Sequence, residues 1–379
     1  MMKRIILPGI MTVLLTAGSA GAQAPAADEN AIVLLSPKDF QVFQRRTLTE
    51  GPVWISGRAI GEFDGMEIRF SGKSAGGATF PQAWSPIAVD PSTGGFCAVV
   101  PVPAGGWYKL EIRSVRRRAV VAQQTVEHVG MGELFVGAGQ SNSTNSGGLG
   151  SKSPLDGRTK PQSGQVSTFS GTEWRVADDP QPGVHDKSGN GSFWPAFGDA
   201  MAEKYKVPVG VAVTGHGGTS INQWKKDGEL FNWTLKRMQQ LGPGGFRAVL
   251  WHQGESDAAT MDAQTYAAGL GQIIRDFKEA AGWEFPWFVA HATYHPGMPP
   301  FEGVRNGQKM LWDQKIALEG PDTDAMTGDL RDKGGKGIHF SKKGLELHGK
   351  AWAEKVGAWL DATLGTTGAK KKKTSGFQW

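Results

Sequence analysis

A short apolar run that ends in a glycine-rich turn constrains this chain more than any other feature of its sequence. Residues 134–136 (Leu-Phe-Val) are typical of a buried strand, and the turn 137–142 (Gly-Ala-Gly-Gln-Ser-Asn) follows at once. Glycines in the turn let the backbone bend sharply, so Ser141 is expected to be exposed at the strand end. A nucleophilic serine needs this position, with N–H groups nearby to bind an oxyanion. The alternative is a loop that only connects a strand to a helix.

From residue 194 onward, helix-like and strand-like segments alternate. Helices are predicted at 196–206, 231–240, 260–281 and 303–318, and a last helix begins near Ser341. Strands are predicted at 208–213, 247–251, 286–292 and 325–327. This alternation favours a parallel sheet covered by helices on both faces. In such a sheet the functional residues lie in loops beyond the carboxyl ends of the strands.

The segment 30–129 has a different pattern, with short apolar or alternating runs separated by Gly, Pro, Asp and Ser. Such spacing predicts a small antiparallel β-sandwich, an Ig-like accessory domain. It contains no cluster of acids and bases, so a packing, linker or glycan-contacting role is expected. The 379 residues leave room for this domain and a larger one at 131–364.

The two ends of the chain carry signals of their own. Lys3 and Arg4, the apolar residues 5–20 and the small residues 20–22 resemble a signal peptide over 1–24, which predicts a secreted or periplasmic protein. Residues 365–379, with four lysines at 370–373, are predicted to be a basic disordered tail. Because part of the net charge of +5 lies there, no nucleic-acid partner is inferred.

No other segment predicts a membrane span. The single cysteine, Cys97, is expected to be buried in a strand.

Three further loops occupy strand ends or precede the last helix. They are 214–220 (Thr-Gly-His-Gly-Gly-Thr-Ser), 252–257 (His-Gln-Gly-Glu-Ser-Asp) and 337–341 (Gly-Ile-His-Phe-Ser). These positions bring the Gly217 amide, the Gln253 side chain and the His339 imidazole to the sheet edge that carries Ser141. Acyl transfer needs a nucleophile, a base and oxyanion donors. Each residue alone has an ordinary structural explanation, but the four together favour catalysis.

A long Gly/Ser/Asp/Pro-rich segment, 147–192, follows the presumed nucleophile. Loops of this length inside a compact domain are usually functional or disordered. In and just after this segment, Trp174, His185 and Trp194 are candidates for a substrate-binding wall, and each is equally explained by ordinary packing.

Four sequence blocks resemble those of the SGNH hydrolases. They are Gly139-Gln140-Ser141-Asn142, Gly217-Gly218-Thr219, His252-Gln253-Gly254-Glu255-Ser256-Asp257 and Ile338-His339. The branch that looks most similar is the sialate O-acetylesterase-like carbohydrate esterases, in which Gln takes the usual Asn position. The resemblance covers roughly residues 132–364. It implies a three-layer α/β/α fold with a flavodoxin-like parallel sheet, no metal or other cofactor, and hydrolysis of small acyl esters, usually acetyl groups on sugars.

The resemblance also implies a role for each matching residue. Ser141 is implied to be the nucleophile, and its own N–H one oxyanion donor. Gly217 is implied to offer a second N–H, with Gly218 as the neighbouring alternative, and the Gln253 side chain a third. His339 is implied to deprotonate Ser141 and then to protonate the leaving sugar hydroxyl.

One position departs from the family pattern. An aspartate often stands three residues before the histidine and orients its ring, but here that position is Lys336. Asp332, Asp329 and Glu255 are candidates to replace it, or a backbone carbonyl holds the ring and leaves a Ser–His dyad. Glu255 has a second interpretation, in which it only braces its own loop.

Three functions fit these residues. The leading hypothesis is a secreted serine esterase that removes O-acetyl groups from an oligo- or polysaccharide. The second is a non-catalytic glycan-binding protein with a degenerate site, an idea motivated by Lys336. The third is an esterase of the same mechanism acting on lipid or peptidoglycan acyl groups, or a short-chain acyl esterase on non-sugar substrates. Ester hydrolysis separates the first from the second, and acyl-chain length separates the first from the third. The sequence does not determine the oligomeric state.

Overall fold

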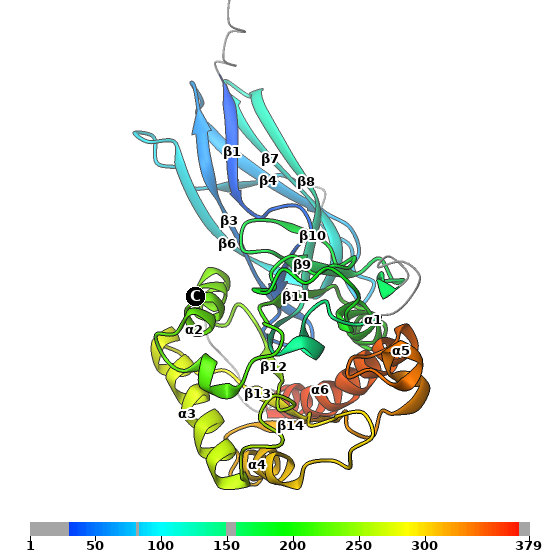
Figure 1. Cartoon of the computed structure of the whole chain (residues 1–379). Helices are drawn as coiled ribbons and strands as arrows, with labels where there is room; N and C mark the ends of the chain where they lie inside the picture. Colours follow the sequence, from blue (N-terminus) through cyan, green and yellow to red (C-terminus); the bar gives the residue numbers. More distant parts are fainter. Residues whose placement is uncertain (1–29, 81–82, 149–156, 371–379) are drawn as a thin grey trace, which may run out of the picture.

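The structure, a computed structural model, describes residues 30–80, 83–148 and 157–370, with only the backbone described for 366–370. A β-sandwich lies at one end of the molecule and a larger α/β domain at the other (Figure 1). The predicted fold class, an α/β domain with a parallel sheet preceded by a small antiparallel sandwich, is confirmed. The predicted signal peptide at 1–24 lies outside the described residues.

Two antiparallel sheets form the sandwich. One has the order β1 (Ala31–Ser36), β3 (Glu50–Ile60) and β6 (Gly95–Pro103). The other has the order β5 (Ser85–Ile87), β4 (Gly65–Ser71), β7 (Gly105–Arg116) and β8 (Ala119–Gly139). Alternate side chains point into the core, as Met66, Ile68 and Phe70 do from β4, because one face of each sheet is solvated.

The strand β8 connects the sandwich to the α/β domain without a break. Its first half pairs with β7, and its second half pairs with β11 (Val209–Val213) and β12 (Ala248–His252) in the centre of the α/β sheet. From Val129 to Gly139 every residue is buried, first in the core of the sandwich and then, from Leu134 on, between the two helical layers of the α/β domain. The domain boundary predicted at 129–131 therefore lies inside one strand.

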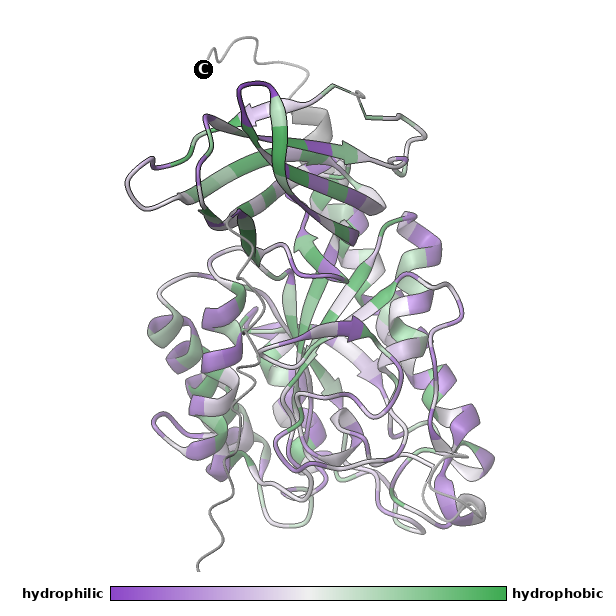
Figure 2. Cartoon of the chain, turned by 90° about the horizontal axis from the view of Figure 1, so that it is seen from above, coloured by the Kyte–Doolittle hydropathy of each residue, from purple (hydrophilic) through white to green (hydrophobic). Residues whose placement is uncertain are grey.

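The α/β sheet has the order β10-β9-β11-β8-β12-β13-β14 and is parallel, except that β10 runs antiparallel to β9. Besides β8, its strands are β9 (Val166–Phe169), β10 (Trp174–Val176), β11 (Val209–Val213), β12 (Ala248–His252), β13 (Trp287–His291) and β14 (Leu318–Asp322). Helices α1 (Trp194–Tyr205) and α6 (Lys342–Lys370) cover one face. Helices α2 (Glu229–Leu241), α3 (Ala263–Ala281) and α4 (Glu302–Asp313) cover the other. Figure 2 shows hydrophobic strands between the two helical layers.

The predicted helices and strands of this domain form, except between residues 314 and 327. The helix predicted at 303–318 ends at Asp313, because Lys315 turns the chain with a left-handed φ of 58°. Residues 318–322 then form β14. The strand predicted at 325–327 is wrong, since these residues lie in the turn and loop after β14.

Two further expectations differ from the structure. Helix α6 continues to Lys370, past the start of the tail predicted to be disordered at 365, while 371–379 lie outside the described residues. Cys97 is exposed on β6 rather than buried, because its side chain faces outward from the sandwich. Within the described ranges, no helix combines the length and apolarity needed to cross a bilayer.

A buried charge cluster fixes the junction of the two domains. Strand β2 (Gln41–Gln44) pairs with β8 there. The fully buried Glu133 of β8 accepts hydrogen bonds from Arg45 Nε and Arg247 Nε, each at 2.7 Å. Removing one partner of a buried pair typically costs about 3–5 kcal/mol, because the other charge stays buried without compensation. The cluster therefore holds the sandwich firmly on the α/β domain.

Candidate active site

The turn that carries Ser141 is shaped by two glycines at the end of β8. A side chain at Gly137 would overlap the Trp194 ring, and one at Gly139 would overlap the carbonyl oxygen of His252. Gly139 also has a φ of +122°, which favours glycine. The chain then enters a short 3-10 helix, η1 (Ser141–Ser143). Ser141 thus stands beyond the carboxyl end of the central strand.

Ser141 is the first residue of η1, so its N–H has no acceptor within that helix. Gly217, from the loop after β11, lies against it: a Cβ at Gly217 would be 3.4 Å from Ser141 Cβ. Ser141 is only 9% exposed, so it is nearly buried rather than exposed as predicted, because neighbouring loops such as that of Gly217 pack against it. The structure therefore brings together the predicted nucleophile and the predicted second amide donor.

The Gly217 N–H already has a hydrogen-bond acceptor, the carboxylate of Asp186. Its Oδ2 accepts the Gly217 N–H at 2.7 Å, and its Oδ1 accepts the Ser188 N–H at 2.9 Å. A carboxylate oxygen thus stands beside Ser141 on one of the two amides predicted to receive an oxyanion. No sequence pattern pointed to Asp186, since it lies in the long loop without periodicity.

Gln253 is placed behind the site rather than open to it. The residue is fully buried, and its Nε2 donates to the Thr219 carbonyl (3.0 Å) and to Asp257 Oδ2 (2.7 Å). Its Oε1 accepts from the Tyr266 hydroxyl at 2.9 Å. These bonds tie the loops after β11 and β12 together. Direct contact with an oxyanion would require one of them to break, and this predicted role stays a prediction.

His339 lies in the loop before α6, with Asp332 beside it. The distance from His339 Nδ1 to Asp332 Oδ2 is 3.8 Å, and the Asp332 N–H donates to the His339 carbonyl at 2.9 Å. Among the described residues, neither carboxylate oxygen of the buried Asp332 has a hydrogen-bond partner. Gly337 makes the approach possible, because a side chain there would overlap the Asp332 carboxylate.

Burial shifts both groups of this pair. It lowers the pKa of His339 to about 4, with the positive charges of Lys333 and Arg331 acting in the same direction. It raises the pKa of Asp332 to about 6. At neutral pH the imidazole is therefore an unprotonated base, and the facing carboxyl group is largely ionised.

The other candidates for orienting His339 lie elsewhere. Lys336 is exposed, and Asp329 binds Lys343 Nζ at the surface with 72% of its side chain exposed. Glu255 accepts a hydrogen bond from Asn142 Nδ2 at 2.8 Å, so it contacts the nucleophile turn and not the histidine. Of the three acids predicted, Asp332 is the one that faces the imidazole.

Asn142 links the loops that carry the predicted nucleophile and the predicted base. Besides its bond to Glu255, its Nδ2 lies 3.3 Å from the carbonyl oxygen of Ile338, the residue before His339. Since Asn142 directly follows Ser141, the predicted nucleophile and the predicted base are held on adjoining loops. Burial raises the pKa of Glu255 to about 7, and Asn142 opposes this shift by donating to the carboxylate.

The predicted substrate wall is only partly realised. Trp194 is buried beneath the turn, where its Nε1 donates to the Ser143 carbonyl. His185 does lie near the site: its Nδ1 is 2.7 Å from the Nδ1 of His216, the neighbour of Gly217, and its ring meets the edge of Trp233. Trp174 stacks on Phe169, away from Ser141.

Within the described ranges, no group of three or more His, Cys, Asp or Glu is arranged to hold a metal ion.

Comparison with known proteins identifies the family of the chain and supports its fold. The model of a family described as "carbohydrate esterase, sialic acid-specific acetylesterase" matches residues 131–357. A probable carbohydrate esterase from Arabidopsis thaliana is 26% identical over 163 residues, which are 38% of this chain and 63% of that protein. The crystal structure of a carbohydrate acetylesterase from Xanthomonas citri is similar with a TM-score of 0.52 at 18% identity, covering 86% of this chain and 74% of that one. The structural similarity shows a shared fold.

Proposed function

This chain belongs to the family of carbohydrate esterases described as sialic acid-specific acetylesterases, and on that premise we propose that it is a serine esterase that removes O-acetyl groups from carbohydrates. The observation that carries the proposal is the meeting of the Ser141 and His339 loops through Asn142, with Asp332 facing the imidazole. The substrate is then an acetylated oligo- or polysaccharide.

In the proposed reaction, Ser141 Oγ attacks the acetyl carbonyl carbon while His339 accepts its proton. The tetrahedral intermediate collapses, the sugar oxygen leaves with the proton from His339, and an acetyl-serine remains. Water, deprotonated by His339, then releases acetate and restores the serine. Asp332 positions the ring and stabilises the imidazolium. The low pKa of His339 suits this role, because the ring is neutral before each step.

The oxyanion is proposed to bind the N–H groups of Ser141 and Gly217. Because Asp186 Oδ2 bonds to the Gly217 N–H in this structure, the substrate has to displace that carboxylate first. One oxyanion donor is typically worth about 10²–10³ in turnover. Gln253 supports the hole by fixing the Thr219 carbonyl, two residues after Gly217.

The test is acetate release from a short acetyl ester and from acetylated polysaccharides, with the wild-type chain and Ser141→Ala. We expect release by the wild type and at least about a 10³-fold loss in the variant, since removing the nucleophile leaves only residual catalysis. A folded wild-type chain that hydrolyses neither class of ester would refute the proposal and favour a glycan-binding protein. Preference for long acyl chains would favour a lipid substrate, and hydrolysis of short esters but of no acetylated polysaccharide would favour a short-chain esterase on non-sugar substrates.

Export is part of the proposal and rests on the sequence of residues 1–24. Amino-terminal sequencing of the protein recovered from the periplasm or medium tests it directly. Cleavage near residue 22 is expected, and an intact Met1 in the cytoplasm would contradict it.

A further inference from the structure

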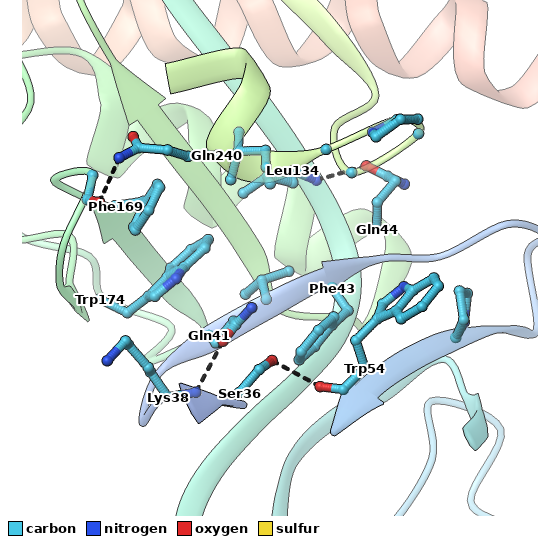
Figure 3. A pocket seen from close by; sticks show the side chains of 18 of the residues that line it. Ser36, Lys38, Gln41, Phe43, Gln44, Trp54, Leu134, Phe169, Trp174 and Gln240 are labelled. Carbon is cyan, nitrogen blue, oxygen red and sulfur yellow. Dashed lines mark hydrogen bonds between the residues drawn. The ribbon is translucent and has the colours of Figure 1, made fainter. Parts of the chain in front are cut away.

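A cavity of about 530 Å³ lies where the sandwich meets the α/β domain (Figure 3). The sandwich contributes β1, the segment through β2, and part of β3. The α/β domain contributes β10, the end of α2 and the turn at 242–245. Two folding units therefore share one hollow that neither would form alone.

This cavity is separate from the catalytic site. Leu134 in its wall lies early in the part of β8 that belongs to the α/β sheet, and five further strand residues lead to Gly139. At about 3.3 Å per residue, that distance is roughly 17 Å along the strand. The turn at 242–245 likewise precedes β12. The cavity thus opens near the amino ends of the strands, whereas Ser141 follows a carboxyl end.

Aromatic rings flank the cavity from both domains. Trp54 of β3 is 50% exposed, which is unusual for so large an apolar side chain. Trp174 of β10 faces it from the other side and is held by stacking on Phe169, with ring centroids 4.9 Å apart. Indole rings offer a large apolar face that can pack on the C–H face of a sugar ring, and the exposed Trp54 leaves such a face open.

The polar groups of the wall are suited to hydroxyl and carboxylate groups. The charged lining residues are Lys38 and Arg46, both exposed cations, and no Asp or Glu is among the described residues that line the cavity. Gln41 uses its Oε1 to accept the Lys38 N–H, and Gln240 uses its Nε2 to donate to Gly171. The Nε2 group of Gln41 and the Oε1 atom of Gln240 are not used in these bonds and can bind a ligand.

The wall is preorganised by the domain junction. Gln44 donates to Glu133 Oε2 at 3.0 Å and accepts the Leu134 N–H at 2.9 Å, so β2 and β8 are locked together at the base of the cavity. A rigid site loses less conformational freedom on binding a ligand.

We propose that this junction cavity, lined by Trp54, Trp174, Arg46 and Lys38, is an accessory binding site for an acidic polysaccharide chain. The two tryptophans stack on sugar rings, and the two cations pair with carboxylates of the polymer. The site binds the polymer independently of ester hydrolysis.

The test is affinity electrophoresis and calorimetry with polygalacturonic acid and, as a neutral polymer, dextran. Ser141→Ala serves as the background, so that no ester is consumed. Trp54→Ala is expected to weaken binding of polygalacturonic acid by about tenfold, and Trp54→Phe by much less, because the phenyl ring retains the stacking face. Arg46→Gln is expected to reduce the preference for polygalacturonic acid over dextran, and Arg46→Lys to retain it. Lys350→Gln, on the exposed surface of α6, controls for loss of a positive charge.

Hydrolysis of a short acetyl ester by Trp54→Ala and Arg46→Gln, in a chain that retains Ser141, should equal that of the wild type. This readout separates failure of the accessory site from failure of the proposed esterase function. Equal binding by Trp54→Ala and its parent, or a folded parent chain that binds neither polymer, would overturn the proposal. A self-association that Trp54→Ala abolishes would instead assign the cavity to an interface between copies of this chain.

Discussion

Glu255 offers the sharpest test of the electrostatics beneath the nucleophile turn. Its side chain is 3% exposed, and Asn142 donates to Oε1, while Oε2 has no hydrogen-bond partner among the described residues. The change Glu255→Gln retains the shape and the oxygen that accepts from Asn142. It replaces the ionisable Oε2 by a neutral amide group, so the pH-dependent part of its effect on stability isolates the free energy of burying the charge.

Burial raises the pKa of Glu255 from 4.5 to about 7. Since one pH unit corresponds to about 1.4 kcal/mol, ionisation costs roughly 3 kcal/mol more in the folded than in the unfolded chain. The folded state therefore binds more protons between these two pKa values, and stability falls as the pH rises from 4.5 through 7. The Glu255→Gln variant does not lose stability in this way, because glutamine does not ionise. We expect it to match the wild type near pH 4 and to exceed it by roughly 3 kcal/mol near pH 8.

The measurement is the free energy of unfolding by urea at several pH values for both chains, with a check that the denaturant slope is the same. Glu354→Gln makes the same chemical change on the exposed surface of α6 and controls for the lost charge. A stability difference that does not depend on pH, or a variant less stable than the wild type at pH 8, would refute the reasoning.

Three further predictions concern catalysis. The acid limb of kcat/KM for a short acetyl ester should have its midpoint between about 4 and 6, because burial lowers the pKa of His339 to about 4 and raises that of Asp332 to about 6; a midpoint above 6.5 would contradict this. Asp332→Asn should lower kcat by up to about 10⁴-fold with little change in KM, as loss of the orienting acid does in serine proteases, and wild-type kcat would show that a carbonyl orients the ring. Asp186→Ala should raise kcat/KM by about tenfold, since a charge-assisted hydrogen bond to the Gly217 amide no longer has to be broken; a fall would mean that Asp186 positions the loop.

Local sequence patterns predicted most of the α/β domain because its elements are governed by local periodicity. The alternation of buried strands and amphipathic helices predicted the sheet, and the glycines at 137 and 139 predicted the turn. The strand β14 was missed because apolar residues at 316–318 continue the helical pattern of α4, while the chain breaks at Lys315 through a backbone conformation that the sequence does not specify. The continuity of β8 was missed for a related reason, since its two halves pair in different sheets.

The candidate site was predictable where the backbone alone fixes position, and less so where side chains meet across loops. Ser141 and Gly217 follow strands that pair directly, so their contact is set by the sheet. Asp332 lies seven residues before His339 and reaches it only because Lys333 and Gly334 take left-handed conformations and Gly337 has no side chain. Asp186 meets Gly217 from a loop of irregular structure. No spacing in the sequence encodes these last two contacts.

The two buried acids bear on the choice between an esterase and a degenerate binding protein. Asp332 faces His339, and among the described residues neither of its carboxylate oxygens has a hydrogen-bond partner. Glu255 contacts the turn of Ser141 through Asn142, and its Oε2 likewise has none. Burial of such groups lowers stability, as the raised pKa values of both show. A protein that only bound glycans would gain stability by replacing either acid with a neutral residue. Groups of this kind cluster where catalysis requires a charge to be held in place, so their presence beside Ser141 and His339 favours an esterase even though Lys336 stands where an aspartate is usual.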